Sequence, residues 1–261
     1  MELCQLLLIT FGASCALFTS AWVLSLIRRD AGIADLFWGA GFVVIAWISW
    51  GLGDASGPRA LVLVALVSIW GVRLSTYLSW RNLGKPEDYR YAAMREKHGE
   101  RFALRSLVTV FLLQGVLAWL ISWPVQIGSF RATGWSAWAT VGVGLWLIGL
   151  LFESVGDFQL ARFKANPQNR GQVMNRGLWR YTRHPNYFGD FLVWWAFFLV
   201  GFDAASWWWT ILGPLLMSFL LIRVSGVHLL ESSLRTRITG YEEYVQRTSA
   251  FFPLPPKRNP A

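Results

Sequence analysis

Seven stretches of apolar residues, each long enough or nearly long enough to cross a lipid bilayer, dominate this sequence. A spanning helix needs about 20 mostly apolar residues, because each residue advances about 1.5 Å through a hydrocarbon core about 30 Å thick. The stretches cover residues 3–26, 33–52, 59–80, 102–125, 135–160, 187–202 and 207–230. The sixth is short, and we expect it to form a hairpin with the seventh. The sequence therefore predicts an all-α, polytopic membrane protein with about seven transmembrane helices.

The composition agrees with this fold class. Only 15% of the 261 residues are charged, whereas soluble domains are about one quarter charged. The 17 Trp residues suit a protein that is anchored at two membrane–water interfaces. Cys4 and Cys15 are the two cysteines of the sequence, which excludes a disulfide framework and a Cys-ligated zinc site.

The basic residues predict the orientation of the spans. They gather in alternate loops, at residues 28–29, 81–105, 162–183 and 235–258, while the opposite loops hold only Arg59 and Arg131. By the positive-inside rule, the N-terminus lies outside and the C-terminus lies in the cytoplasm. The net charge of +9 thus reflects topology, with an anionic ligand as a further candidate cause. Because the charge is divided among loops without a nucleic-acid motif, we expect no nucleic-acid partner, and nothing indicates an obligate protein partner.

Several polar residues lie where membrane-spanning segments begin or run, and ionisable groups at that depth are functional candidates. Asp35 opens the second span, where it either stabilises the helix N-terminus or serves function. Tyr77 is either an interfacial anchor or part of a site. Glu153 and Asp157 lie one helical turn apart in the fifth span, and two carboxylates repel each other unless a cation or donor is near. No histidine spacing typical of a metal site accompanies them, so we expect no metal.

Residues 175–190, NRGLWRYTRHPNYFGD, form the most informative stretch. Three arginines, one histidine, two asparagines and four aromatic residues surround the predicted start of the sixth helix. Arginine side chains and a helix N-terminus together favour an anion site. Asn186 and Asp190, one turn apart, offer groups that suit ribose hydroxyls or an amide. A basic loop beside the membrane explains the arginines but not the density of other polar groups. Further along, His228 and Glu231 lie three residues apart near the cytoplasmic end of the seventh span.

The run from Gly177 to Asp190 resembles the C-terminal signature of the steroid 5-alpha-reductase superfamily. The whole chain resembles more closely its uncharacterised bacterial branch, the DUF1295 proteins, which carry runs similar to residues 35–39 (DLFWG), 87–91 (EDYRY) and 240–253. This resemblance implies one integral-membrane enzyme domain over residues 1–261, in the bacterial inner membrane. Helices of residues 1–130 would face a hydrophobic steroid or lipid substrate, and residues 131–261 would bind NADPH.

The resemblance also implies roles for individual residues. Asp35 corresponds to a carboxylic acid that hydrogen-bonds the substrate carbonyl, and Tyr77 is our candidate for the tyrosine that acts with it. The predicted NADPH-binding residues are Asn82, Lys85, Glu153, Asp157, Lys164, Arg176, Tyr181, Arg183, His184, Asn186, Tyr187, Asp190, His228 and Glu231.

Two alternatives stay open. The same signature resembles S-adenosylmethionine-dependent membrane methyltransferases of the isoprenylcysteine carboxyl methyltransferase type, with Arg183, His184 and Glu231 at matching positions. A non-catalytic lipid-binding protein is the other alternative, although unpartnered polar groups are costly to keep in a membrane. The clustered arginines favour NADPH, which carries several phosphates, over S-adenosylmethionine, which has none. No Gly-x-Gly-x-x-Gly motif follows a strand, so a Rossmann domain is not expected.

Overall fold

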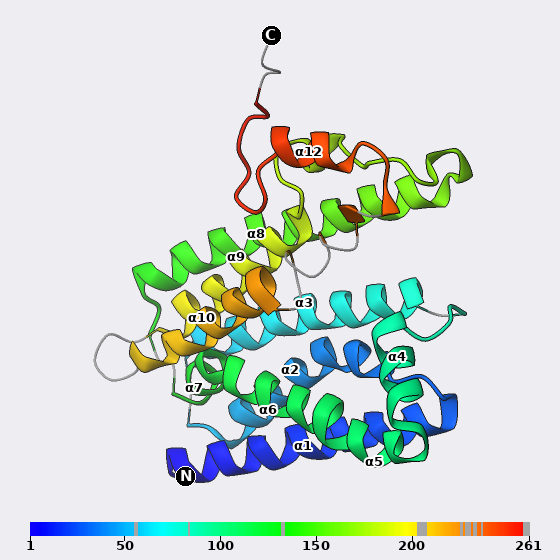
Figure 1. Ribbon diagram of the computed structural model, residues 1–261. Coiled ribbons are helices and arrows are strands. Elements are labelled where there is room, and N and C mark those ends of the chain that lie inside the picture. Colours follow the sequence, from blue (N-terminus) through cyan, green and yellow to red (C-terminus); the bar gives the residue numbers. More distant parts are fainter. Residues whose placement is uncertain are drawn as a thin grey trace. The chain divides into compact units, whose positions relative to one another are not determined.

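The structure is a computed structural model that describes residues 1–54, 57–82, 84–131, 134–202, 208–224, 227, 231, 234–235 and 237–257. Within these residues the regular structure is helical, apart from an isolated parallel bridge between Thr182 and Ser249. Figure 1 shows the helices in chain order. The predicted all-α fold class is confirmed.

Five helical stretches in the described part of the chain are long and apolar enough to cross a membrane. They are α1 (Leu3–Arg28), α2 (Ile33–Leu52), α3 (Pro58–Asn82), a succession of helical segments over Tyr89–Ile121, and α8 (Ala137–Ala165). A shorter apolar helical stretch covers Trp208–Val224. The chain is therefore a polytopic membrane protein, while the count of seven spans and their orientation stay predictions.

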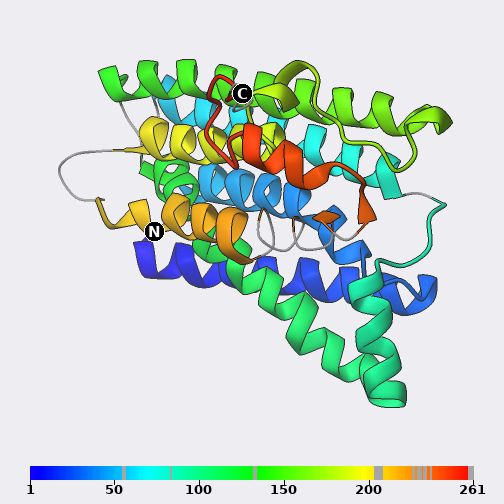
Figure 2. The same cartoon turned by 45° about the horizontal axis from the view of Figure 1, so that its top comes forward.

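The fourth stretch differs most from its predicted range of 102–125. It consists of α4 (Tyr89–His98), a 3-10 turn (Gly99–Arg101), α5 (Phe102–Ser106), a π-helix (Leu107–Leu112) and α6 (Leu113–Ile121). Gly99 has a φ of 53°, and α4 makes an angle with α5 and α6 in Figures 1 and 2. The helix ends before Pro124 because proline lacks an amide donor and its ring clashes with the preceding turn. A new helix, α7 (Trp123–Arg131), begins there.

The C-terminal part of the chain has shorter elements. Two 3-10 turns (Pro167–Asn169 and Gly177–Arg180) lead to α9 (Pro185–Gly201), which has 17 residues. The predicted seventh span contains a 3-10 turn (Trp208–Ile211), α10 (Leu212–Phe219) and a π-helix (Leu220–Val224). The last described helix is α12 (Tyr241–Arg247).

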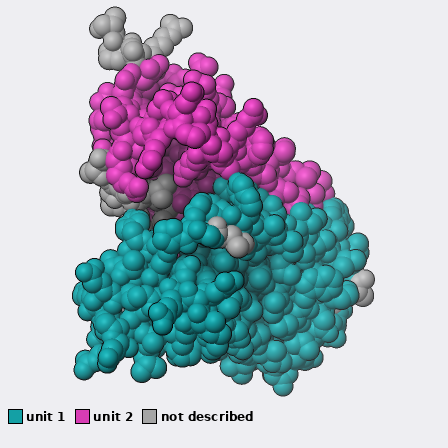
Figure 3. Space-filling model, turned by 90° about the vertical axis from the view of Figure 1, so that its right-hand side faces the viewer, with its two compact units in different colours: residues 1–139, 200–213 teal, residues 140–199, 214–261 magenta. Residues whose placement is uncertain are grey.

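The chain divides into two compact units, coloured separately in Figure 3. Unit 1 comprises Met1–Ala139 and Val200–Gly213, and unit 2 comprises Thr140–Leu199 and Pro214–Ala261. The predicted division of labour between residues 1–130 and 131–261 is functional and stays a prediction.

In unit 1, α2 packs against α1, α3, α6 and α7. Its closest approach to α3 is at Gly39 and Gly71, where a Cβ added to either residue would collide with the carbonyl oxygen of the other. Small residues let membrane helices approach closely in this way. Ser75 bridges the same crossing, since its Oγ donates to the Leu36 carbonyl (3.0 Å) and accepts from the Ala40 amide (3.0 Å). The N-terminal half of α2, which carries Asp35, is thereby held close to α3.

In unit 2, α9 packs closely against α8 near Glu153 and Asn186, two of the predicted site residues. A Cβ added to Gly189 would lie 2.5 Å from the Gly149 carbonyl oxygen and 2.8 Å from the Glu153 Cβ. One added to Gly156 would lie 3.1 Å from the Asn186 amide nitrogen. Glycine at these positions therefore brings the start of α9 within contact distance of the carboxylates of α8.

Candidate functional site

The loop before α9 is fastened by the C-terminal segment of unit 2. The Arg183 amide donates to the Ser249 carbonyl (2.9 Å), and the Leu254 amide donates to the Tyr181 carbonyl (3.0 Å). The Tyr244 hydroxyl donates to the Trp179 carbonyl. Figures 1 and 2 show α12 lying beside this loop. Residues about sixty positions apart in the sequence thus shape the stretch that carries the predicted signature.

Arg183 and His184, at the end of this loop, form a buried cluster with Glu231. Arg183 binds Glu231 through two parallel bonds, Nε to Oε1 (2.7 Å) and Nη2 to Oε2 (3.0 Å). Its Nη1 donates to the carbonyls of Val245 (3.0 Å) and Thr248 (2.5 Å). His184 Nε2 lies 3.0 Å from Glu231 Oε1, and because a carboxylate only accepts, Nε2 carries the proton.

The electrostatics of this cluster follow from its burial and its pairing. Burial alone would raise the pKa of Glu231, but hydrogen bonds from His184 and Arg183 instead lower that pKa to about 2. Burial lowers the pKa of His184, against the opposing effect of Glu231. At neutral pH the cluster therefore holds a cationic Arg183, an anionic Glu231 and a neutral His184. The Tyr187 ring stacks on His184, with centroids 5.5 Å apart.

A second polar cluster lies where α9 meets α8. Glu153 and Asp157 are 3% and 4% exposed, and the Asn186 side-chain amide donates to Asp157 Oδ1 (3.1 Å). Glu153, Asp157 and Asn186, all predicted from the sequence, therefore gather at the start of α9. Asp190 lies one turn further along α9. Buried carboxylates of this kind need donors or cations as partners.

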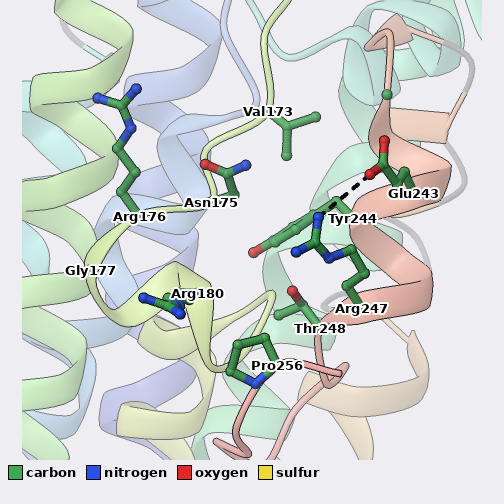
Figure 4. A pocket seen from close by; sticks show the side chains of 11 residues that line it. Val173, Asn175, Arg176, Gly177, Arg180, Glu243, Tyr244, Arg247, Thr248 and Pro256 are labelled. Carbon is green, nitrogen blue, oxygen red and sulfur yellow. Dashed lines mark hydrogen bonds and ion pairs between the residues drawn. The ribbon is translucent and has the colours of Figure 1, made fainter. Parts of the chain in front are cut away.

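Two adjoining cavities open beside the fastened loop. The first, of about 470 Å³, lies between the loop and α12 and is lined by Arg176, Arg180 and Arg247. In Figure 4, Arg180 and Arg247 lie on opposite sides of this space, and Glu243 pairs with Arg247 at 3.5 Å. Three guanidinium groups against one carboxylate give the cavity a net positive charge, which suits a phosphate-bearing ligand.

The second cavity, of about 570 Å³, is more apolar. Aromatic side chains, among them Trp179 and Tyr241, line it together with the predicted residues Lys164, Arg183 and His184. Tyr244 belongs to the walls of both cavities, so the two adjoin. Burial raises the pKa of Tyr241 to about 12, which keeps its hydroxyl protonated at neutral pH. The pair of cavities offers a charged end and an aromatic end to one elongated ligand.

In unit 1, Asp35 lies beside a tyrosine, but that tyrosine is Tyr91. The Tyr91 hydroxyl donates to Asp35 Oδ1 (3.3 Å), and Arg90 Nη2 lies 3.7 Å from Asp35 Oδ2. Tyr91 is 8% exposed. Tyr77 has Arg73 and Arg81 over its ring, at 5.3 and 5.8 Å from the centroid. The catalytic role of Tyr77 stays a prediction.

Contacts of the run 87–91 place Tyr91 beside Asp35. Glu87 accepts from the Ala31 amide (2.8 Å) and binds Arg95 through two bonds. Asp88 caps α4 by accepting from the Arg90 amide (2.9 Å). Partial burial would raise the pKa values of Glu87 and Asp88, but their hydrogen bonds hold both below the usual range. The run therefore ties the start of α4 to the start of α2 and brings Tyr91 to Asp35.

The remaining predicted residues are more scattered. Asn82 is half-buried at the end of α3, and Lys85 is exposed in the loop that follows. The Lys85 backbone amide donates to the Asn82 carbonyl (3.1 Å). Tyr181 is 44% exposed. His228 lies outside the described residues. Within the ranges that the structure describes, no group of three or more His, Cys, Asp or Glu residues could hold a metal ion.

Sequence reasoning did not single out Tyr91, Arg180 or Arg247 as site residues. Arg180 and Tyr91 belong to the runs 175–190 and 87–91, but neither run shows which side chain lines a site. Arg247 is the last residue of α12, and only the packing of α12 on the loop brings it to the wall of the first cavity. A basic residue at a helix C-terminus is ordinarily read as stabilising that terminus.

The fold and the sites define an all-helical integral membrane protein with a cation-lined cavity in its C-terminal unit. The chain belongs to the DUF1295 family, described as a protein of unknown function, whose model matches residues 21–248. It is similar to an uncharacterised protein of Schizosaccharomyces pombe, with 27% identity over 237 residues that cover 79% of this chain and 67% of the yeast protein. No solved structure matches the chain significantly.

Proposed function

We propose that this protein is a membrane-embedded, NADPH-dependent reductase that acts on the carbon–carbon double bond of a hydrophobic, 3-oxo-steroid-like enone. The resemblance of residues 177–190 to the steroid 5-alpha-reductase superfamily suggests this chemistry. The observation that carries the proposal is the cavity lined by Arg176, Arg180 and Arg247, which adjoins an aromatic cavity.

The residues of unit 2 fit a dinucleotide phosphate. The three arginines suit phosphate groups, because guanidinium donors match phosphate oxygens in geometry and charge. The adjoining aromatic cavity suits a ring. Asn186, with the carboxylates of Glu153 and Asp157, offers an acceptor and donor set that matches a carboxamide. When bound, NADPH would supply a hydride.

The residues of unit 1 would act on the substrate carbonyl. The Tyr91 hydroxyl, which donates to Asp35 at 3.3 Å, would redirect its one proton to a carbonyl oxygen on which negative charge develops. Such a donor contributes about 3–4 kcal/mol to transition-state stabilisation. Tyr91 itself is 8% exposed, and a donor with little access to water interacts more strongly.

An S-adenosylmethionine-dependent methyltransferase is the second candidate. The observation that favours it is the pair of buried carboxylates, Glu153 and Asp157, which would also suit a sulfonium or an amine. This candidate gives no role to the arginine-lined cavity, since S-adenosylmethionine carries no phosphate.

Thermal unfolding of the detergent-solubilised protein with NADPH, NADH or S-adenosylmethionine tests the proposal. A ligand at about 100 times its dissociation constant stabilises by about 2.7 kcal/mol, so we expect a higher melting temperature with NADPH. Arg180→Ala and Arg247→Ala should each weaken NADPH binding about tenfold, because a hydrogen bond to a charged group is lost.

Arg162 is an exposed arginine of α8 that lines neither cavity. Arg162→Ala is therefore the matched control and should bind NADPH as the wild type does. Stabilisation by S-adenosylmethionine alone would refute the reductase and favour the methyltransferase. Equal weakening by all three arginine variants would show that general charge, and not the cavity, attracts the nucleotide.

A further inference from the structure

Gln114 is an uncharged polar residue within the apolar stretch Tyr89–Ile121. It lies on α6, two residues after the π-helix Leu107–Leu112. A π-helix shifts the residues that follow it around the helix axis, and such segments are frequent at functional sites. An amide side chain in this setting needs partners, and its partners lie on two other helices.

Gln114 is the middle of a hydrogen-bonded chain that ends at Asp35. The Trp38 indole Nε1 donates to Gln114 Oε1 (2.7 Å). Gln114 Nε2 donates to the Tyr91 hydroxyl oxygen (3.3 Å), and the Tyr91 hydroxyl donates to Asp35 Oδ1 (3.3 Å). These hydrogen bonds run from α2 to α6, then to α4, and return to α2.

The first member of this chain fixes the direction of every later bond. An indole N–H donates and never accepts, so the Gln114 atom that faces Trp38 is the amide oxygen. The amide nitrogen then faces Tyr91 and can only donate. The Tyr91 oxygen therefore accepts from Gln114, and its one proton is directed to the side where Asp35 lies.

We propose that Trp38 and Gln114 are positioning residues that hold the Tyr91 hydroxyl as a hydrogen-bond donor, directed to Asp35 in the free protein and to the substrate carbonyl in place of Asp35 when substrate is bound. This inference deepens the proposed function and rests on it for the identity of the acceptor, a carbonyl oxygen. Without Trp38, the Gln114 amide can rotate and present its oxygen to Tyr91, which would draw the phenolic proton away from the substrate. The site thus selects substrates that offer an acceptor oxygen at this point.

Three variants test the direction of the chain. Gln114→Glu keeps the shape and an acceptor for Trp38 but removes the donor to Tyr91. Gln114→Met removes both, and Trp38→Phe removes only the group that orders the amide. We expect the Gln114 variants to lower kcat for enone reduction about tenfold, with the KM for NADPH unchanged, and Trp38→Phe to lower kcat less.

The effects of Trp38→Phe and Gln114→Glu should be non-additive, because both act through one chain. Trp47→Phe is the control, since Trp47 is exposed and its Nε1 donates to Ser68 (3.0 Å) on the neighbouring helix, outside the Tyr91 hydrogen bonds. It should leave kcat unchanged.

A second readout needs neither cofactor nor turnover. The infrared C–O stretching band of Tyr91, isolated as the difference between the protein and its Tyr91→Phe variant, reports whether the phenol donates or accepts. We expect this band to shift in Gln114→Glu, Gln114→Met and Trp38→Phe, but not in Trp47→Phe.

An unshifted band in all three variants would overturn the inference, whatever the enzyme reduces. A shifted band together with unchanged kcat would also overturn it, because the chain would then have no effect on the reaction. If NADPH does not stabilise the protein, the proposed reductase fails while the infrared result still decides whether Trp38 and Gln114 orient Tyr91.

Discussion

Arg183 shows, at the scale of a single residue, how partners limit what a side chain can do. Glu231 and the carbonyls of Val245 and Thr248 accept four hydrogen bonds from its guanidinium group. A guanidinium has five N–H donors, so little donor capacity remains for a ligand. Arg180 and Arg247, which line the first cavity, are better placed for that purpose. The predicted contact between Arg183 and the cofactor stays a prediction.

Glu231→Gln should destabilise the protein by about 3–5 kcal/mol at pH 7, because it leaves Arg183 buried without its counter-ion. Thermal or denaturant unfolding in detergent measures this loss. Glu242→Gln is the control, since the pair of Glu242 with Arg235 (2.6 Å) is exposed and such pairs contribute about 0–1 kcal/mol. Equal losses in the two variants would contradict the structural role of Glu231.

The low pKa of Glu231 also predicts that the stability of the protein depends on pH. The folded-state pKa of Glu231 is about 2, below its ordinary value of 4.5. Its stabilising effect is therefore complete above pH 4.5 and is lost as the pH falls toward 2. The pKa of His184 is also lowered, so its protonation in the unfolded state acts in the same direction below pH 6.5. The stability difference between wild type and Glu231→Gln should shrink as unfolding is measured at progressively lower pH.

Tyr91→Phe should lower enone turnover by about 100- to 1,000-fold, because a donor to the substrate carbonyl is lost. Asp35→Asn should also lower it, because the carboxylate that accepts from the Tyr91 hydroxyl is lost. NADPH binding, measured by thermal shift, should be unchanged in both. Tyr77→Phe serves as the comparison, since Tyr77 interacts with Arg73 and Arg81. A larger effect for Tyr77→Phe than for Tyr91→Phe would favour the original sequence assignment.

At the scale of elements, the closeness of α8 and α9 depends on glycine. Gly189→Ala would place a methyl group 2.5 Å from the Gly149 carbonyl oxygen and should destabilise unit 2 by about 1–3 kcal/mol through overpacking. Gly144 lies on α8, and a Cβ added there meets nothing within 4 Å. Gly144→Ala should therefore be neutral or slightly stabilising. Unfolding measurements that rank these two variants in the opposite order would contradict the packing described here.

The elements also show what a sequence can predict. Spans over residues 3–26, 33–52 and 59–80 follow from the length of their apolar runs, and the structure has helices over those residues. Asp157 and Asn186 were predicted from local spacing, and they meet because α9 turns back along α8. The pairing of Asp35 with Tyr91 was not predicted. Periodicity places a residue on one face of its own helix, but the partner across a gap of fifty-six residues depends on how α4 packs against α2.

At the scale of the whole molecule, the distribution of basic residues predicts the sidedness of the protein in its membrane. We expect Asp54→Cys, in a background without Cys4 and Cys15, to react with a membrane-impermeant maleimide added to intact cells. Lys257→Cys in the same background should react only after the membrane is opened. Both positions are exposed, so accessibility of the side chain itself does not limit the comparison. The reverse pattern would invert the predicted orientation.

The fastening of the loop 177–184 by the C-terminal segment has a consequence for biosynthesis. Tyr181, Thr182 and Arg183 bind backbone groups of residues 249–254, and Glu231 neutralises Arg183 from within the same late portion of the chain. During translation, the helices up to α9 can enter the membrane while these partners are still inside the ribosome. The proposed ligand binding by unit 2 would therefore be among the last properties that a newly made molecule acquires, and a nascent chain stalled before residue 231 would be inserted without it.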